Sequence, residues 1–501
     1  MKARWLTLFA CVPLIVGTVL LQSCGGVGGP ASPATSPGSN APTQAFLALL
    51  TPAQKASKSI GPLACAAATC HGGASTSQHV AAKLASLSTT PTGSETGQYA
   101  TWKLTVHASK GVTCENCHGP GGAHQAQPTN ADGTPNAILT FPNITSPAVC
   151  GQCHGPEHDD WAASEHSQVI TTPITETVSS PAADGQTQQC MLCHGGLVRA
   201  QYTENGVTPE QMTTTQIVNA CNSILNTVPY TASCATCHNP HAKTGNLTGT
   251  GQEAQIYHSE VLTASTGIAP GTTPDQYTRV NQICGQCHNG RATNGTDTYL
   301  QANTSRPSAH HSNQFNSLLG VGGAESPDGP PQRSGTHALA PGQCATCHMP
   351  ASRHTFTVSY EGCAPCHTTT DAAARASALQ TEIVDDLTAL NTEMSNWAQT
   401  TFGNPTGWDF SSNQTGTPSS QAAIPIEIKR ARHNYYYEVI SGDYGVHNPA
   451  YTRYLMQWAE TNLQNLGLPK ANRSEIAKMP MAVKLQQIKL ARKNLAKLPI
   501  D

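Results

Sequence analysis

The chain has 501 residues, of which 38% are hydrophobic, 5% aromatic and 11% charged, and its formal net charge at pH 7 is -3. This balance excludes the general basic surface that nucleic-acid binding needs, so we expect no nucleic-acid partner. Seven Phe and six Trp are few for a chain of this length, while Gly and Pro number 43 and 35. Either much of the chain is loop, or a group other than side chains fills its interior.

Residues 1–23 predict a lipoprotein signal peptide. Two basic residues precede an apolar stretch over 5–21, which is typical of an export signal rather than of a spanning helix. The stretch ends in Leu-Gln-Ser-Cys24, which resembles a bacterial lipobox with the lipid attached to Cys24. The alternative is an ordinary signal peptide with an incidental cysteine.

Residues 24–61 predict a lipid-anchored linker, because their first part is rich in Gly, Pro, Ser and Thr. Such a tether lets a domain stand away from a membrane. A Gly follows Cys24, where an Asp often marks retention in the inner membrane, so the outer membrane is favoured. We therefore expect an exported protein, anchored in the bacterial envelope on the periplasmic or outer-membrane side.

Sixteen of the 19 cysteines fall in eight motifs that end in Cys-His; seven read C-x-x-C-H and the first reads C-x4-C-H. We number the motifs 1 to 8 in chain order. Their cysteines are Cys65 and Cys70, Cys114 and Cys117, Cys150 and Cys153, Cys190 and Cys193, Cys234 and Cys237, Cys284 and Cys287, Cys344 and Cys347, and Cys363 and Cys366. The histidines that follow them are His71, His118, His154, His194, His238, His288, His348 and His367. The other cysteines are Cys11, Cys24 and Cys221.

C-x-x-C-H is the attachment signature of c-type haem. Two thiols add to the vinyl groups on one edge of the porphyrin, and the adjacent His then lies under the ring and binds iron. A disulfide framework or paired zinc sites would also use many cysteines, but neither needs a His after every pair. The longer loop of motif 1 occurs in some multihaem cytochromes. We therefore predict eight covalently attached haems (haem c, iron).

Eight haems between residues 62 and 370 also explain the composition, because porphyrins would fill the interior and coil would wrap them. The expected fold class is mainly α with extensive coil: an octahaem cytochrome c core over 62–370, followed by long C-terminal helices over 371–501. Successive motifs begin 19 to 60 residues apart, so the haems must pack near one another.

Each iron also needs a sixth ligand. Among the Met residues only Met191, Met212 and Met349 fall within or near the motifs, so a second His is the default. Eight such ligands are predicted: His107, His124, His166, His241, His311, His337, His354 and His447. The other histidines outside the motifs are His79, His158, His258, His310 and His433. Ligation by two His implies low potentials and no open position for a substrate.

Local patterns between about Trp161 and Tyr454 carry a family resemblance. Motif 7 reads C-A-T-C-H-M-P, motif 8 follows it closely, and motif 6 precedes both. In this order they resemble the last three haem motifs of the superfamily of pentahaem cytochrome c nitrite reductases and octahaem hydroxylamine oxidoreductases. The resemblance implies four sixth ligands: His354 at motif 5, His166 at motif 6, His447 at motif 7 and His337 at motif 8.

The same resemblance implies that motif 4, with Cys190, Cys193 and His194, is the candidate for a catalytic haem. Nitrite reductases carry Lys where this chain has His194. Their Glu and Tyr after the motif matching motif 6 are absent here, as is an Arg over 169–189. The stretch around His310 and His311 resembles the one that holds the family's active-site His, although either could serve as a sixth ligand. A Lys-ligated nitrite reductase is therefore disfavoured.

In hydroxylamine oxidoreductases a Tyr is cross-linked to the catalytic haem. Tyr435, Tyr436 and Tyr437 are candidates by composition only. Three successive Tyr on a helix point in different directions, so packing against haem edges is the alternative role.

The C-terminal region predicts four helices. The first covers 371–397 with helical spacing of its apolar residues, and the second covers 426–440. Asn448-Pro449 predicts the start of a third, which runs to about Leu466, and 480–497 forms a fourth. By resemblance such helices support the core and homo-oligomer contacts. Residues 470–501 hold eight basic and two acidic residues, which could dock an acidic partner or lipid headgroups, or form a solvated face.

The sequence favours an electron carrier that passes electrons along mostly bis-His haems in the bacterial envelope. Its partners would be other redox proteins or quinol-linked donors, with the membrane reached through Cys24. The alternative is a reductase or oxidase of small nitrogen or sulfur compounds, with an open haem at Cys190 and Cys193. A third hypothesis, subunits that stack into a conducting filament, fits a lipid anchor poorly.

Overall fold

The computed structural model describes residues 42–66, 71, 98–167, 191, 193–203, 212–225, 232–242, 254–256, 283–290, 295–302, 312–333, 335–340, 342–364, 366–410 and 416–495. In these ranges the chain is helical with extensive coil, and pairing between extended segments is limited to isolated bridges at Thr129–Pro135 and His238–Ile256. The expected fold class, mainly α with extensive coil, is confirmed. No described helix has both the length and the apolar composition needed to cross a bilayer.

Short helices make up the part of the chain that carries the motifs. They are α1 (Gln44–Leu49), α2 (Pro52–Ala56), α3 (Pro62–Cys65), α5 (Gln98–Trp102), α6 (Val106–Ser109), α7 (Cys114–His118), α8 (Gly122–Ala126), α9 (Pro147–Cys150), α10 (Gly155–Ala162), α13 (Gly196–Thr203), α14 (Thr214–Leu225), α15 (Cys234–Cys237), α17 (Asp297–Ala302), α18 (Gln314–Leu319) and α19 (Cys344–His348). Single 3-10 turns connect some of them, including η2 (Glu165–Ser167) and η5 (Thr336–Leu339).

Two of these short helices lie in the predicted linker. Phe46 and Leu50 are buried against Leu139 and Val149, so α1 packs on the body of the protein. The apolar spacing of Phe46 and Leu50, four residues apart, explains why this segment folds back as a helix. Of the linker predicted over 24–61, the structure describes residues 42–61, and this part packs on the protein instead of forming a free tether. The signal peptide, Cys24 and the Gly/Pro-rich stretch lie outside the described residues.

Five helices form the C-terminal part: α20 (Thr369–Phe402), α21 (Ile426–Ser441), α22 (Pro449–Asn465), α23 (Arg473–Lys478) and α24 (Met481–Leu495). Thr368 caps α20 by accepting the Asp371 N–H at 3.2 Å, and Gly403, with φ +67°, ends it. Asn448 caps α22 ahead of Pro449, as the sequence predicts.

A continuous apolar core joins these helices. Ile383, Leu387 and Leu390 of α20 are fully buried against side chains of α21 and α22, among them Leu455. Burying side chains of this size contributes about 1.5–3 kcal/mol each. The C-terminal part therefore has a conventional side-chain core, in contrast to the region of the motifs.

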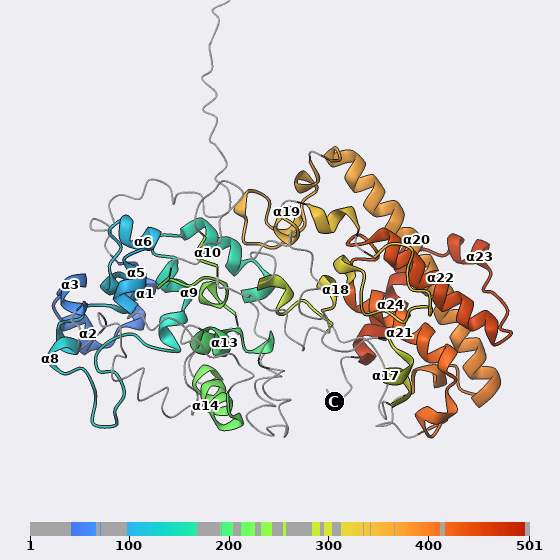
Figure 1. Cartoon of the computed structure of the whole chain (residues 1–501), viewed down its shortest axis with the longest axis horizontal. Helices are drawn as coiled ribbons and strands as arrows, with labels where there is room; N and C mark the ends of the chain where they lie inside the picture. Colours follow the sequence, from blue (N-terminus) through green and yellow to red (C-terminus); the bar gives the residue numbers. More distant parts are fainter. Residues whose placement is uncertain are drawn as a thin grey trace, which may run out of the picture.

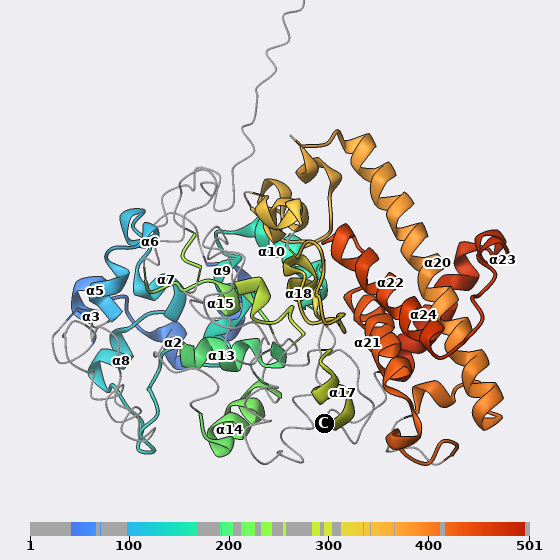
Figure 2. The same cartoon turned by 45° about the vertical axis from the view of Figure 1, so that its right-hand side comes forward.

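The two parts lie at opposite ends of the molecule (Figures 1 and 2). Helices α1 to α15 occupy one end and α20 to α24 the other. In both views α18 and α19 lie between them. Motif 7, on α19, is therefore placed where the haem region meets the C-terminal helices.

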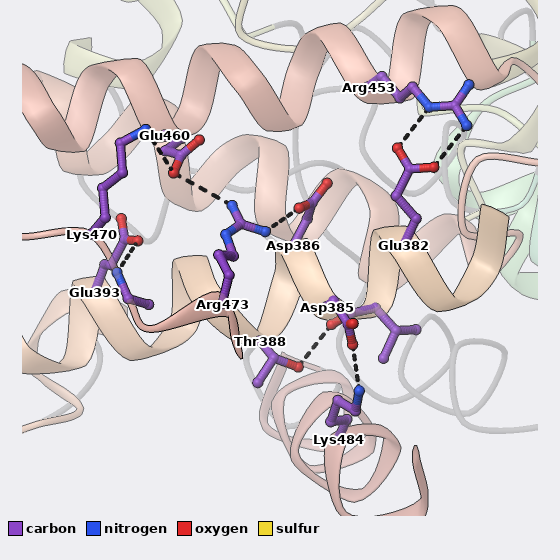
Figure 3. A network of polar contacts seen from close by, with 12 residues as sticks. Glu382, Asp385, Asp386, Thr388, Glu393, Arg453, Glu460, Lys470, Arg473 and Lys484 are labelled. Atoms are coloured by element: carbon purple, nitrogen blue, oxygen red, sulfur yellow. Dashed lines mark hydrogen bonds and ion pairs between the residues drawn. The ribbon is translucent and has the colours of Figure 1, made fainter. Parts of the chain in front are cut away.

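Ion pairs reinforce the C-terminal helices (Figure 3). Arg453 of α22 donates two hydrogen bonds of 2.7 Å to the Glu382 carboxylate of α20. Arg473 and Lys484 pair with Asp386 and Asp385 of the same helix. Part of the basic charge over 470–501 is therefore neutralised by α20 rather than presented to solvent.

Candidate haem sites

The motif cysteines are placed by one-turn helices. In α7, α15 and α19 the first cysteine is also the first helical residue, so the second cysteine, three residues on, returns to the same face. Small polar residues help to start these turns: the Thr113 N–H donates to the Asn116 Oδ1 at 2.7 Å and the Ser233 N–H to the Thr236 Oγ1 at 3.0 Å. The residues between the cysteines thus support the geometry that two thioether bonds require.

Neither alternative use of the cysteines finds support in the described ranges. No disulfide joins the 15 cysteines that the structure describes. Within the same ranges, no group of three or more His, Cys, Asp or Glu side chains converges as a structural zinc ion requires.

All eight motifs line one continuous cavity of about 3670 Å³. A site for one small ligand usually measures about 300–1,000 Å³, so this cavity has room for several cofactors. The cysteines and histidines face it together with apolar residues such as Val149, Phe315 and Leu339. The chain therefore forms a shell around a space that side chains do not fill, which is what haem groups in the interior need.

Six pairs of imidazole rings face each other in this cavity. The separations of their ring centroids are 6.4 Å for His71–His124, 5.8 Å for His118–His241, 6.2 Å for His154–His107, 6.3 Å for His238–His354, 6.1 Å for His288–His166 and 6.3 Å for His348–His447. Two imidazoles that bind one metal from opposite sides at about 2.0–2.1 Å have ring centres roughly 6.3 Å apart. Every pair combines one motif His with one His outside the motifs.

Hydrogen bonds to carbonyl oxygens orient several of these rings. Because a carbonyl oxygen only accepts, the Nδ1 atom must carry the proton, and the lone pair is then on Nε2. Among motif residues, His118 donates to Leu139 O at 2.8 Å, His238 to Ala254 O at 2.7 Å and His348 to Phe356 O at 3.0 Å. Among the partners, His124 donates to Asn136 O at 2.9 Å and His354 to Ser352 O at 2.8 Å. This tautomer is the one that metal-ligating His commonly adopts.

Burial favours the neutral form of several of these rings. It lowers the pKa of His107, His166 and His238 to about 4, because charge is costly away from water. A neutral imidazole is also the form that binds a metal. At His447 burial acts in the same direction, but the neighbouring Asp443 carboxylate outweighs it and raises the pKa. The facing geometry of the described rings fits a haem iron between the two rings of each pair.

The predicted ligands of motif 8 lie in the same cavity but are not among the six facing pairs. His337 donates its Nδ1 proton to Val446 O at 2.7 Å, and the Nδ1 of His367 is 3.5 Å from the Asp371 carboxylate. At motif 4, Cys193 and His194 line the cavity. Cys190, Cys70, His310 and His311 lie outside the described residues, as do His79 and His258.

Two described histidines outside the motifs have other surroundings. His158 lies beside Asp159, with its Nδ1 at 3.2 Å from the carboxylate, and belongs to none of the facing pairs. His433 is buried among the C-terminal helices and donates Nε2–H to Gly322 O at 2.9 Å. Neither was predicted as a ligand.

Met191 and Cys221 form part of a separate apolar cluster. Their sulfur atoms are 3.5 Å apart, and both side chains are fully buried with Leu197, Val198 and Ile217. Met191 therefore packs away from the cavity, although it lies between the cysteines of motif 4.

Contacts between thiols place the motifs relative to one another. Thiols come within hydrogen-bonding reach in five pairs: Cys65–Cys114, Cys150–Cys234, Cys284–Cys344, Cys347–Cys363 and Cys193–Cys287. In two further pairs, Cys117–Cys153 and Cys237–Cys284, the thiols are near enough to interact electrostatically. The motifs therefore follow one another in space as 1, 2, 3, 5, 6, 7 and 8, and motif 4 lies beside motif 6. This order could not be predicted from the sequence, because it depends on contacts between distant segments.

Glu115 of motif 2 ties the first two motifs together. One carboxylate oxygen accepts the N–H groups of Ile60 and Gly121 at 2.9 and 2.7 Å, and the other accepts that of Gly61 at 2.8 Å. Gly61 precedes α3, which ends at Cys65. Glu115, which lies between the two cysteines of motif 2, thus holds the start of the helix that ends at Cys65 of motif 1.

A search of protein families finds a match for part of the chain. Residues 149–221, which contain motifs 3 and 4, match the family "Cytochrome c554 and c-prime". Together with the eight motifs, this match supports a multihaem c-type cytochrome. Binding of c-type haem and a role in electron transfer are the general properties of such a protein.

Two solved structures resemble this multihaem cytochrome. An undecahaem cytochrome from the S-layer of Carboxydothermus ferrireducens has 19% identity and a TM-score of 0.42, and the match covers 72% of this chain and 51% of that one. The outer cell wall cytochrome OcwA has 16% identity and a TM-score of 0.41, and the match covers 70% of each chain. The chain thus spans about half of the undecahaem protein. No match is found among curated proteins.

Proposed function

We propose that the protein is an octahaem c-type cytochrome that relays electrons along its haems. The observation that carries the proposal is the set of six facing imidazole pairs, each made of one motif His and one His from elsewhere. An iron held between two His has no open coordination position. Such an iron accepts and donates electrons without binding a substrate.

The proposed sixth ligands follow from these pairs at six motifs and from the resemblance at motif 8. At motif 4 either His310 or His311 could serve, and His311 is the one proposed. They are His124 at motif 1, His241 at motif 2, His107 at motif 3, His311 at motif 4, His354 at motif 5, His166 at motif 6, His447 at motif 7 and His337 at motif 8. The haems supply the one-electron chemistry. The chain's own residues attach them, supply both axial ligands and keep each imidazole in one tautomer through its Nδ1 proton.

The order of thiol contacts supports a main route through seven haems. Motifs 1, 2, 3, 5, 6, 7 and 8 form a row, and electrons would enter at one end of it and leave at the other. Motif 4 is a side branch at motif 6, where Cys193 meets Cys287. Other redox proteins or quinol-linked donors would then dock at the two ends of the octahaem core over 62–370.

Export and lipid anchoring complete the proposal. The signal peptide over 1–23 and the lipobox at Cys24 would place the protein on the periplasmic or outer-membrane side of a bacterial envelope. The helices over 371–501 would support the core and could join subunits into a homo-oligomer.

Mass spectrometry and low-temperature EPR of the oxidised protein test the proposal together. The expected result is a mass increase of eight haems and low-spin iron at every site. A smaller number of haems would contradict the octahaem assignment. A strong high-spin signal in the resting protein would contradict a relay made only of bis-His sites.

A second function, catalysis at motif 4, is favoured by one observation. Cys193 of motif 4 lies beside Cys287 of motif 6, so a haem at motif 4 could exchange electrons with the relay while its other side meets a substrate. The protein would then reduce or oxidise a small nitrogen or sulfur compound. This candidate predicts that nitrite, hydroxylamine or cyanide changes the spectrum of one haem; unchanged spectra with all three would refute it.

A further inference from the structure

Phe356 lies between the imidazoles of two different haem sites. Its ring centroid is 4.4 Å from that of His166, at an interplanar angle of 87°, and 5.9 Å from that of His354, at 78°. His166 faces the motif 6 His, and His354 faces the motif 5 His. One aromatic ring thus contacts, edge to face, the proposed sixth ligands of two neighbouring haems.

The backbone of the same residue reaches a third site. The Phe356 carbonyl oxygen accepts the Nδ1 proton of His348, the motif 7 His, at 3.0 Å. Phe356 has φ +55°, a left-handed conformation that a bulky residue rarely adopts. Residues in such conformations persist only where their surroundings hold them, and they gather at functional sites.

The surrounding loop is fixed on both sides of Phe356. Ser352, with φ +64°, accepts the Nδ1 proton of His354 through its carbonyl oxygen at 2.8 Å. The His354 N–H donates to the Asp160 carboxylate of α10 at 3.1 Å. Since α10 leads directly to the turn that carries His166, the ligands of motifs 5 and 6 are attached to one rigid unit.

We propose that Phe356 is a positioning residue that couples the axial ligands of haems 5, 6 and 7. Its ring sets the orientation of the His166 imidazole and supports that of His354, while its carbonyl holds the proton that orients His348. Ligand orientation and the hydrogen bond on Nδ1 both tune the potential of a haem iron. The inference rests on the proposed bis-His ligation at these three sites.

Three variants separate the ring from the backbone. Phe356→Asn removes the ring but tolerates the left-handed conformation, so the carbonyl stays in place. Phe356→Tyr keeps both the ring and the carbonyl. As a matched control, Phe402→Leu removes an edge-to-face contact with Trp397, at 5.2 Å and 85°, that involves no proposed ligand.

Low-temperature EPR and spectroelectrochemical titration of the full-length holoprotein are the readouts. With Phe356→Asn we expect two of the low-spin components to change their g values and two midpoint potentials to shift, while the total haem content is unchanged. Phe356→Tyr should retain the wild-type spectra and potentials. Phe402→Leu should leave both as in the wild type.

Wild-type spectra and potentials in Phe356→Asn would overturn the inference. Should Phe356→Asn fail to accumulate with full haem content, Phe356→Leu, which keeps an apolar side chain without a ring, is measured against the same criteria. Absence of bis-His low-spin signals from the wild-type protein would refute the proposed function itself. The inference rests on that function, so it would be rejected without any measurement on the variants.

Discussion

At the scale of single residues, Cys221 differs from the motif cysteines in its surroundings. It is fully buried in an apolar cluster, and burial raises the pKa of its thiol to about 12. Burial also raises the pKa of motif thiols such as Cys237, so the location of the side chain, and not its pKa, separates Cys221 from them. The motif cysteines instead line the cavity, where they can meet the edge of a porphyrin.

This difference predicts opposite effects of cysteine substitutions on haem content. Cys221→Ser should retain every haem, but it places a hydroxyl in an apolar cluster and should cost about 1–3 kcal/mol of stability. Replacing both Cys114 and Cys117 by Ala should remove the mass of one haem. Mass spectrometry and thermal unfolding measure the two effects. Loss of a haem in Cys221→Ser would contradict the separation of the two kinds of cysteine.

Residue chemistry also decides what could be predicted from the sequence. The attachment residues were predictable, because covalent addition to a porphyrin dictates the C-x-x-C-H spacing. The pairing of His241 with His118 could not be predicted, since these residues are far apart in the chain and no local pattern links them. Only the resemblance, through motif order, indicated partners for motifs 5 to 8.

At the scale of elements, the C-terminal helices follow their own sequence signals closely. Helix α20 extends the predicted 371–397 at both ends, because Thr368 caps its start and its C-terminal turns continue to Gly403. The motif region is different. Its one-turn helices carry too few residues for a periodic pattern, so their positions depend on the haem motifs rather than on hydrophobic spacing.

The core of α20 predicts a large effect from a single truncation. Leu387 is fully buried, and Leu387→Ala should lower the free energy of unfolding of the C-terminal part by about 2–5 kcal/mol. Leu490→Ala on α24, where the side chain is 59% exposed, is the matched control and should change stability little. Chemical denaturation followed by far-UV circular dichroism compares them. Equal effects would contradict the assignment of the core.

A carboxyl group on α20 predicts a dependence of stability on pH. Glu393 is buried and accepts the Ala471 N–H at 2.8 Å (Figure 3), and burial raises its pKa above the usual value of 4.5. The folded state therefore favours the protonated form. Its contribution to stability is fully present below pH 4.5 and is lost as the pH rises through the raised pKa.

Glu393→Gln should remove this contribution while keeping an oxygen for the hydrogen bond. The variant should lose less stability than the wild type between pH 4 and pH 7, and it should be the more stable of the two at pH 7. Unfolding midpoints measured across this range provide the test. Parallel pH profiles for variant and wild type would show that Glu393 ionises as it does in water.

At the scale of the whole molecule, the spatial order of the motifs differs from their order in the chain. Motif 6 interacts with motifs 4, 5 and 7 through its thiols, and the described cysteine of motif 4 interacts with Cys287 of motif 6. The two positions should therefore differ in their importance for long-range electron transfer.

Removing one haem at a time tests that difference. Cys284→Ala with Cys287→Ala should interrupt the row and lower the current through single molecules held between electrodes by at least about tenfold. The matched variant, Cys190→Ala with Cys193→Ala, should leave most of the current. If both variants conduct equally well, the proposed route is wrong.

The facing histidines also bear on how the chain is tied together. His118 faces His241, His166 faces His288, His238 faces His354, and His348 faces His447, so the four spans of chain overlap one after another. An iron in each pair would close a long loop, and each such loop would share residues with the next. The iron atoms would then cross-link successive segments of the chain. Release of one axial ligand would loosen segments more than a hundred residues away in the chain, and site 2 could not be completed during export until His241 had emerged.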